Sequence, residues 1–332
     1  MAQLLEPSAP LKREDIADEF AIVDMKACPI TTAIRKGPAP NNMLFEYPLD
    51  KYAVPALGGR ADGVDVAPAD LFNGLENAAK VGCRAQWFHR AVGVGKIAGA
   101  VPDIAGVGKG KAFAYAIKKK LVELKRNIEY TLLSAQESAA DNGTLGSLTR
   151  GIGKWIQVTV QSDQPVPVAY LPVAGQVITT ATVGAFTEAN LQSILEAMWG
   201  VTGSRDVITV PCRAAFQSVI TNFLDSDVQS ATSLPIRRFN MDGDSGTIKM
   251  VVNRYVGDFG ECQFLPVPFL DDTNALKHMA YFLHLDRWHL RVQQNPAQEE
   301  LPYGGGSRRA QLDAILGLAC TNPLGEAKVT IL

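Results

Sequence analysis

The pattern of apolar and polar residues is clearest between residues 112 and 138, where it predicts one long amphipathic helix. Charged residues occupy most of the remaining surface of this helix, and pairs such as Lys119/Glu123 and Lys125/Glu129 have the spacing of solvated ion pairs. At about 1.5 Å per residue, the helix would be about 40 Å long. Apolar residues recur every three or four positions and would form one buried stripe: Phe113, Ile117, Leu121, Leu124, Ile128 and Leu132. A long rod that carries no catalytic group indicates an architectural role.

Shorter patterns predict a mixed α+β fold around this helix. Alternating residues predict strands at 43–57 and 82–94, joined by a segment rich in Gly, Asp and Ala. Such an extended hairpin has little core of its own, so it needs another surface to cover it, for instance a second copy of the chain. Thr187 caps an expected helix, and another is expected near 214–224. Further strands are expected at 155–160, 207–210, 247–256, 261–269, 280–285, 290–293, 312–320 and 327–332.

Residues 1–40 differ from the rest because they are polar and interrupted by prolines. Only a short helical pattern, near residues 13–20, occurs in them. A segment of this kind cannot bury a core, and it is expected to be an arm that lies on an outside surface.

Composition narrows the class of protein without defining a function. The chain has 332 residues, of which 47% are hydrophobic, so it can bury a substantial core and is expected to form two domains. Its net charge of −2 gives no overall attraction to nucleic acid or to an anionic membrane. No apolar run is long enough to span a bilayer, and the first residues lack the layout of a secretory signal. We therefore expect a soluble, intracellular protein.

The five cysteines are distant from one another and include no CxxC pair, which favours buried thiols over disulfides or a zinc site. His284 and His289 would point to opposite faces of a strand and could not share a metal. Asp242 and Asp244 suggest a calcium loop, but Asn253 stands where the closing Glu is required, so a tight turn is favoured. No metal or other cofactor is expected.

The glycine-rich segment 106–111 resembles a phosphate-binding loop but lacks the first glycine and the final hydroxyl residue of that motif. A hinge before the long helix explains Gly106, Gly108 and Gly110 better. The basic residues at 118–126 could contact phosphates, although a solvated helix face is favoured because Glu123 and Glu129 balance them. No catalytic set is visible, so the chain is not expected to be an enzyme.

Several segments, taken in order, resemble a known family. They are TTAIRKG at 31–37, LFEYPLDKY at 44–52, ELKRNIE at 123–129, RGIGKW at 150–155, FTEANLQSILEAMWG at 186–200, RYVGDFG at 254–260 and TNPLGEAKVTIL at 321–332. Their order and spacing resemble those of the major capsid proteins of tailed bacteriophages, which share the Hong Kong 97 capsid fold. The glycine-rich Tyr303–Ser307 departs from the more regular turn of that family.

The resemblance implies names for the parts of the chain. Residues 1–40 would be the N-terminal arm and 41–100 the extended loop, both lying on neighbouring subunits. A peripheral domain would comprise 101–199, with the spine helix 112–138, and would be rejoined by 286–332. Residues 200–285 would form the axial domain at fivefold and sixfold centres. Candidate intersubunit contacts are Arg35, Lys36, Phe45, Tyr47, Trp87 and Phe88.

The resemblance also implies a function. The chain would assemble with itself, as pentamers and hexamers, into the icosahedral head of a virion built in the host bacterial cytoplasm. It would enclose double-stranded DNA without sequence specificity, together with a portal and any scaffolding or cement proteins, and would contact no membrane. The hinge glycines would let the extended loop swing when a procapsid expands. Two alternatives remain at this point: an encapsulin-type shell around cargo enzymes, and an unrelated soluble α+β enzyme.

Overall fold

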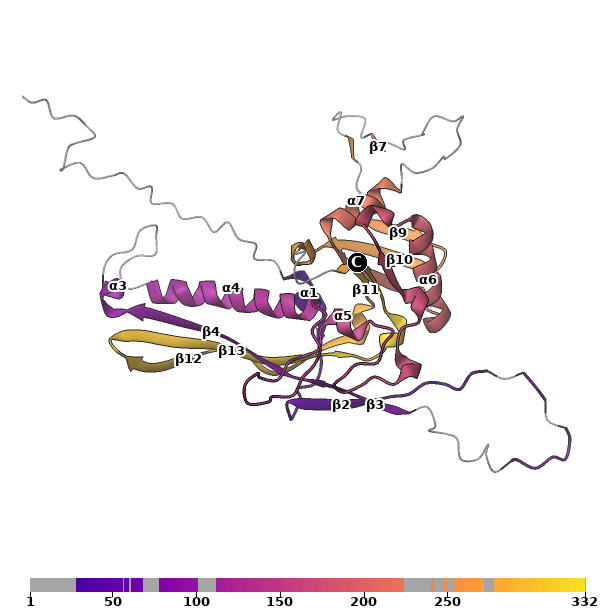
Figure 1. Ribbon diagram of the computed structural model, residues 1–332, viewed down its shortest axis with the longest axis horizontal. Coiled ribbons are helices and arrows are strands. Elements are labelled where there is room, and N and C mark those ends of the chain that lie inside the picture. The colour runs from indigo at the N-terminus through magenta and orange to yellow at the C-terminus, as the bar shows by residue number, and fades with distance from the viewer. Residues whose placement is uncertain are drawn as a thin grey trace, which may run out of the picture. The chain divides into compact units, whose positions relative to one another are not determined.

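The computed structural model describes residues 28–55, 57–59, 61–67, 78–100, 112–223, 240–241, 248–249, 253–271 and 278–331. The helical pattern at 13–20, the Asp242/Asp244 turn and the hinge candidates Gly106, Gly108 and Gly110 lie outside these residues. The chain divides into two compact units (Figure 1). The first includes His89–Leu124 and Ala297–Asp313, and the second comprises Cys28–Phe88, Lys125–Pro296 and Ala314–Leu332.

The first unit is built on the beginning of the long helix α4 (Ala112–Leu133). Its strands are parts of β4 (Gln86–Gly95), β12 (Trp288–Gly304) and β13 (Ser307–Cys320), and α3 (Lys96–Ala100) follows β4. Phe113 of α4 packs with Val92 and Ala310, and the Arg308 guanidinium lies 4.4 Å from the centre of the Phe113 ring. The two residues between β12 and β13, Gly305 and Gly306, have φ angles of 60° and 80°, which favour glycine and make a tight hairpin turn.

The second unit contains a six-stranded sheet. Its strand order is β5 (Val177–Thr180), β14 (Ala327–Ile331), β11 (His278–Phe282), β6 (Val207–Cys212), β10 (Gly260–Pro266) and β9 (Arg254–Gly257). Strand β14 pairs in parallel with β5 and antiparallel with β11. Helices α6 (Glu188–Thr202) and α7 (Ala214–Asn222) contribute Leu191, Ile194, Phe216 and Ile220 to one buried cluster with this sheet.

The remaining elements are short. They are α1 (Pro29–Ala33), β1 (Arg35–Lys36), β2 (Leu44–Leu49), β3 (Ala79–Arg84), α5 (Ile152–Trp155), β7 (Asn240–Met241) and β8 (Ile248–Lys249). Single turns of 3-10 helix occur at Val168–Tyr170, Ala174–Gln176, Val183–Ala185, Pro268–Asp271, Leu285–Arg287 and Pro323–Gly325. Strands β1, β12, β13 and β4 form a four-stranded sheet, whereas β2 and β3 pair with each other as a separate hairpin.

The strongest local signals in the sequence are confirmed. In α4, Phe113, Leu124, Ile128 and Leu132 of the predicted stripe are buried. Helix α6 begins after Thr187, whose hydroxyl accepts a hydrogen bond from the Asn190 amide at 3.4 Å. Residues with a local cause, namely helical spacing and an N-cap, are therefore placed correctly by sequence alone.

Helix α4 ends at Leu133 and not at Ser138 as predicted, because its backbone finds other partners. The Ser134 carbonyl accepts from the Gly153 amide at 3.1 Å, and the Gln136 carbonyl accepts from the Gly151 amide at 3.0 Å. The charged faces also differ from the prediction. Glu123 pairs with Lys120, and Glu129 is fully buried and does not lie on a solvated face.

Several strand predictions are also wrong in extent or type. The strand expected at 43–57 is β2, which ends at Leu49. The strand expected at 82–94 is two strands, β3 and β4, which change sheets at Ala85. The strand expected at 155–160 is preceded by helix α5, which contains Trp155, and 157–160 is not a strand. The strand expected at 290–293 is the 17-residue β12, which the alternation alone did not show because residues 293–300 are exposed throughout.

Gly151, which precedes α5, offers a direct test of this arrangement. A Cβ at this position would lie 2.2 Å from the Ser134 carbonyl oxygen, which is backbone and cannot move aside cheaply. We expect Gly151→Ala to lower the free energy of unfolding by at least about 3 kcal/mol, measured by urea titration of unassembled subunits. Gly146→Ala is the control, because nothing lies within 4 Å of a Cβ there, and an equal loss in both variants would contradict the assignment.

Candidate intersubunit loop and the polar junction at its base

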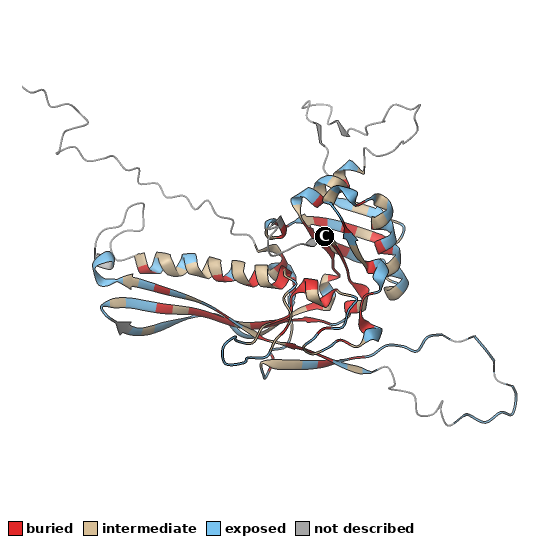
Figure 2. Cartoon of the chain, viewed as in Figure 1, coloured by how far each residue is buried: buried red, intermediate tan, exposed pale blue. Residues whose placement is uncertain are grey.

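The connection between β2 and β3 exposes large apolar side chains to solvent. Tyr52, Val54 and Leu57 are 97%, 83% and 105% exposed, and Val64 and Val66 are also exposed. We call these five residues the apolar loop; Figure 2 shows the described parts of this connection as exposed. Several large apolar side chains exposed in one segment indicate an interaction site, because water solvates them poorly.

The hairpin that carries the loop is held on one face by the body of the second unit. Strands β2 and β3 pair antiparallel from Leu44↔Arg84 to Leu49↔Ala79. On the inward face, the Tyr47 hydroxyl donates to the Cys320 carbonyl at 2.8 Å and accepts from the Cys320 amide at 3.2 Å. Burial raises the pKa of Tyr47 well above its ordinary value, so the hydroxyl stays protonated and able to donate.

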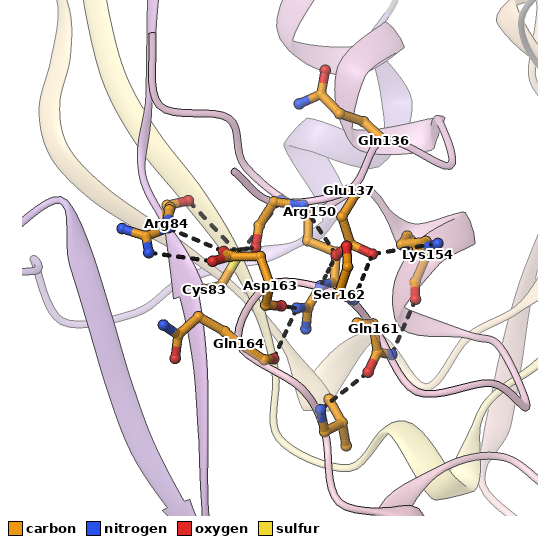
Figure 3. Close-up of polar contacts among 12 residues, drawn as sticks. Cys83, Arg84, Gln136, Glu137, Arg150, Lys154, Gln161, Ser162, Asp163 and Gln164 are labelled. Carbon is orange, nitrogen blue, oxygen red and sulfur yellow. Dashed lines mark hydrogen bonds and ion pairs between the residues drawn. The ribbon is translucent and has the colours of Figure 1, made fainter. Parts of the chain in front are cut away.

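A group of charged side chains surrounds the base of the hairpin, and we call it the polar junction (Figure 3). Its centre is Arg150, which is fully buried. The Arg150 Nε donates to Glu137 Oε1 at 3.2 Å, and Nη2 donates to the carbonyls of Asp163 and, at 2.9 Å, Gln164. The guanidinium also lies 4.5 Å from the centre of the Trp155 ring. The junction consists of Arg84, Glu137, Ser138, Arg150, Lys154 and Asp163.

Asp163 connects this junction to the hairpin. Its carboxylate accepts from Arg84 Nε at 3.0 Å and Nη2 at 3.2 Å, and from the Ser138 hydroxyl at 2.6 Å. Burial alone would raise the pKa of Asp163, but the hydrogen bonds from Arg84 and Ser138 and the charges of Arg84 and Arg150 lower it below its ordinary value. Because Arg84 is the last residue of β3, the ion pair fixes one end of the hairpin.

The loop beside Asp163 also lies against the hairpin backbone. Gln164 has a φ of 46°, a left-handed conformation that is unfavourable for a residue other than glycine. A Cβ on Gly82 of β3 would lie 2.8 Å from the Gln164 side-chain oxygen, so a larger residue there would displace the end of that side chain. The unusual backbone of Gln164 is held in place by the hydrogen bond that its carbonyl accepts from Arg150.

The candidate contact residues from the sequence occupy different environments. Arg35 and Lys36 are exposed on β1, and Trp87 on β4 is 52% exposed. Tyr47 and Phe88 are buried within the chain itself. Phe45 is half-buried, and its ring would lie 2.7 Å from a Cβ on Gly317.

The sequence did not identify Arg150 and Asp163 as important residues. Arg150 stands in the segment RGIGKW, where two glycines and a tryptophan surround a charged residue, and this was the available signal. Among the described residues, no group of three or more His, Cys, Asp or Glu side chains could hold a metal ion. None of the described helices is long and apolar enough to cross a membrane. The polar junction can position a hairpin, but its charges are already paired with one another.

The ion pair of Asp163 predicts a specific dependence of stability on pH. A carboxylate whose pKa is lowered by folding stabilises the native state above its unfolded pKa, and this contribution disappears as the pH falls toward the folded value. Asp163→Asn should therefore lower the free energy of unfolding by about 1–3 kcal/mol at pH 7, and by progressively less as the pH falls below the ordinary pKa of an aspartate. Urea titrations between pH 7 and 3 would measure this. Glu46→Gln, on an exposed pair with Lys80, should change little; a constant deficit for Asp163→Asn at every pH would contradict the prediction.

Comparison with known structures connects this architecture to phage capsids. The chain is similar to a chain of Mycobacterium phage Bobi, with 11% identity, a TM-score of 0.59, and 100% and 99% of the two chains covered. It is also similar to the cyanophage A-1(L) capsid asymmetric unit, with 13% identity, a TM-score of 0.63, and 99% of each chain covered. For the capsid of the native GTA particle, the identity is 8% and the TM-score 0.62, with 98% and 97% covered. At these identities the likeness establishes the fold, and the predicted Hong Kong 97-like α+β class is confirmed.

Sequence comparison identifies the family. No curated protein matches the chain significantly. The model of the family described as SU10 major capsid protein, in contrast, matches residues 5–332, which is almost the whole chain. The chain therefore belongs to the SU10 major capsid protein family and is a structural protein of a phage head.

Proposed function

We propose that copies of this chain associate through the apolar loop to close the icosahedral head of a tailed phage. The loop of each subunit would lie on a neighbour, and pentamers and hexamers would assemble in the host cytoplasm. The observation that carries this proposal is the exposure of Tyr52, Val54 and Leu57 on a hairpin whose base is fixed. Interactions within the subunit hold the base of the hairpin, and the apolar side chains of the loop stay exposed.

The energetic argument rests on apolar area. Burying apolar surface stabilises by about 25 cal/mol per Å², so a Tyr, a Val and a Leu moved from solvent into an interface can contribute several kcal/mol before the loss of chain entropy. One such contact gives a weak dimer. In a closed shell each subunit makes several contacts at once, and the later contacts form at a high effective concentration. A small favourable free energy at each loop contact is then sufficient for a stable particle.

We assign the rest of the chain in the same framework. Residues 200–285 would form the axial domain at the centres of pentamers and hexamers, and 101–199 with 286–332 the peripheral domain around α4. The support for this division is that α7, β6, β9, β10 and β11 fall within 200–285 and share one sheet and buried cluster, to which β5, α6 and β14 from outside this range also contribute.

The charge of the chain bears on how the particle would hold its contents. With a net charge of −2, the subunit has no overall attraction for DNA, so the head would confine packaged DNA without sequence-specific binding. DNA would enter through a portal, and assembly would use scaffolding or cement proteins where the shell needs them. The proposal gives the subunit no catalytic role. A shell that encloses cargo proteins could be built from subunits of the same fold. The contents of the particle distinguish such a shell from a phage head.

The apolar loop can be tested by replacing its side chains together. Tyr52→Ser, Val54→Ser and Leu57→Ser in one variant should leave the unfolding curve of the subunit within about 0.5 kcal/mol of the wild type, because all three residues are exposed. We expect the same variant to lose closed particles in negative-stain electron microscopy and to elute as small species from a size-exclusion column. Lys51→Ser, an exposed polar neighbour, is the control and should assemble normally. Normal shells from the triple variant would reject the loop as the principal contact.

The identity of the enclosed material tests the function itself. Particles purified from infected cells should contain nuclease-protected double-stranded DNA that becomes sensitive once the shells are opened. Particles that contain a defined set of proteins and no nucleic acid would instead favour the cargo-enclosing alternative. This experiment does not depend on which residues form the contacts, so it separates a wrong function from a wrong interface.

A further inference from the structure

Helix α4 holds the segment that precedes β1 through one buried carboxylate. Glu129 is fully buried, and its two oxygens accept from the backbone amides of Ile30, at 2.9 Å, and Thr31, at 2.7 Å. The Thr31 hydroxyl donates to the same carboxylate. Ile30 and Thr31 lie in the first turn of α1, whose amides have no partner within the helix. Glu129 therefore caps a helix that is distant in the sequence.

A second anchor follows within a few residues. Strand β1 pairs in parallel with β12, with Arg35 opposite His289 and Lys36 opposite Leu290. The Gly37 amide donates to the Leu290 carbonyl at 2.9 Å, and Arg291 Nη1 donates to the Pro38 carbonyl at 3.2 Å. Ile30, at the Glu129 contact, and Ile34, just before β1, are both buried. Residues 28–38, which we call the strap, thus run from α4 to β12 within the second unit.

We propose that the strap is a built-in clasp of the single subunit, closed by Glu129 before any neighbour is present. The sequence assigned all of residues 1–40 to an arm that lies on neighbouring subunits. The geometry revises that assignment from residue 28 onward, because residues 28–38 are secured to their own chain. Glu129 is a positioning residue, because it fixes where the strap begins.

The hydrogen bonds of Glu129 favour an arrangement in which the strap stays attached to its own subunit. A carboxylate that accepts from several donors away from water forms charge-assisted hydrogen bonds, which are about twice as strong as neutral ones. Replacing one of its oxygens by an NH2 group leaves one of the two α1 amides opposite a donor in place of an acceptor. The competing arrangement is a domain-swapped one, in which the strap of one subunit closes on the Glu129 of another only when the shell forms. The two arrangements differ in the free subunit.

Hydrogen exchange on full-length wild-type subunits, kept unassembled at low concentration and checked by size exclusion, tests the clasp directly. We expect the Ile30 and Thr31 amides to be protected already in this state. In Glu129→Gln, protection of these amides should fall on the order of tenfold, and trypsin should cleave between Arg35 and Lys36 about tenfold faster. Thr31→Val, which keeps the amide and removes the hydroxyl, should give a smaller change in the same direction.

Glu123→Gln is the matched control, because Glu123 is another carboxylate of α4 but pairs with Lys120 and not with the strap. It should leave protection and cleavage unchanged. Unprotected Ile30 and Thr31 amides in wild-type subunits that gain protection only on assembly would overturn the proposal in favour of the swapped arrangement. Equal protection in wild type and Glu129→Gln, or an equal loss in Glu123→Gln, would overturn the role of Glu129. The wild-type measurement is decisive even if the Glu129 variant does not fold.

Discussion

The buried guanidinium of Arg150 is the interaction on which the base of the extended hairpin depends. Removing a cation from water is costly, and contacts from surrounding groups offset that cost. Arg150 Nη1 is buried without a hydrogen-bond partner, so the contacts of Nε, Nη2 and the guanidinium face must offset it. Here the partners come from separate segments: Glu137 after α4, two backbone carbonyls at 163 and 164, and the ring of Trp155. Because one side chain requires all of them in place, those segments cannot shift independently. The position of β3, held by Asp163, follows from this requirement.

The same logic separates two kinds of surface on one chain. At the hairpin base, Asp163 pairs with Arg84 and Ser138 of its own chain, whereas apolar groups in the connection between β2 and β3 are left in solvent. A subunit with an internally paired hairpin base and an exposed apolar loop can fold alone and still associate strongly when many copies are present. The rigid base limits the directions from which a neighbour can approach, and this favours a closed particle over irregular aggregation.

Local patterns in the sequence predicted the features that depend only on residues close together in the chain. The stripe through Leu124, Ile128 and Leu132 and the cap at Thr187 need only helical geometry, and both appear as expected. The burial of Glu129 and Arg150 was not predicted, because charged residues lie outside by default and only distant partners reverse that rule. The end of α4 was misplaced for the same reason: residues 151 and 153 supply the competing hydrogen bonds. The family resemblance supplied the architecture that local patterns could not.

The strand order of the six-stranded sheet has a consequence for synthesis on the ribosome. Strand β14 lies between β5 and β11, yet it follows every other strand of that sheet in the chain. Until β14 has been synthesised, the two strands that flank its place have no partner on that side, and β5 is separated from the other four strands. The sheet can be completed only after residues 327–331 have left the exit tunnel, so chains truncated before them cannot join β5 to the rest of the sheet.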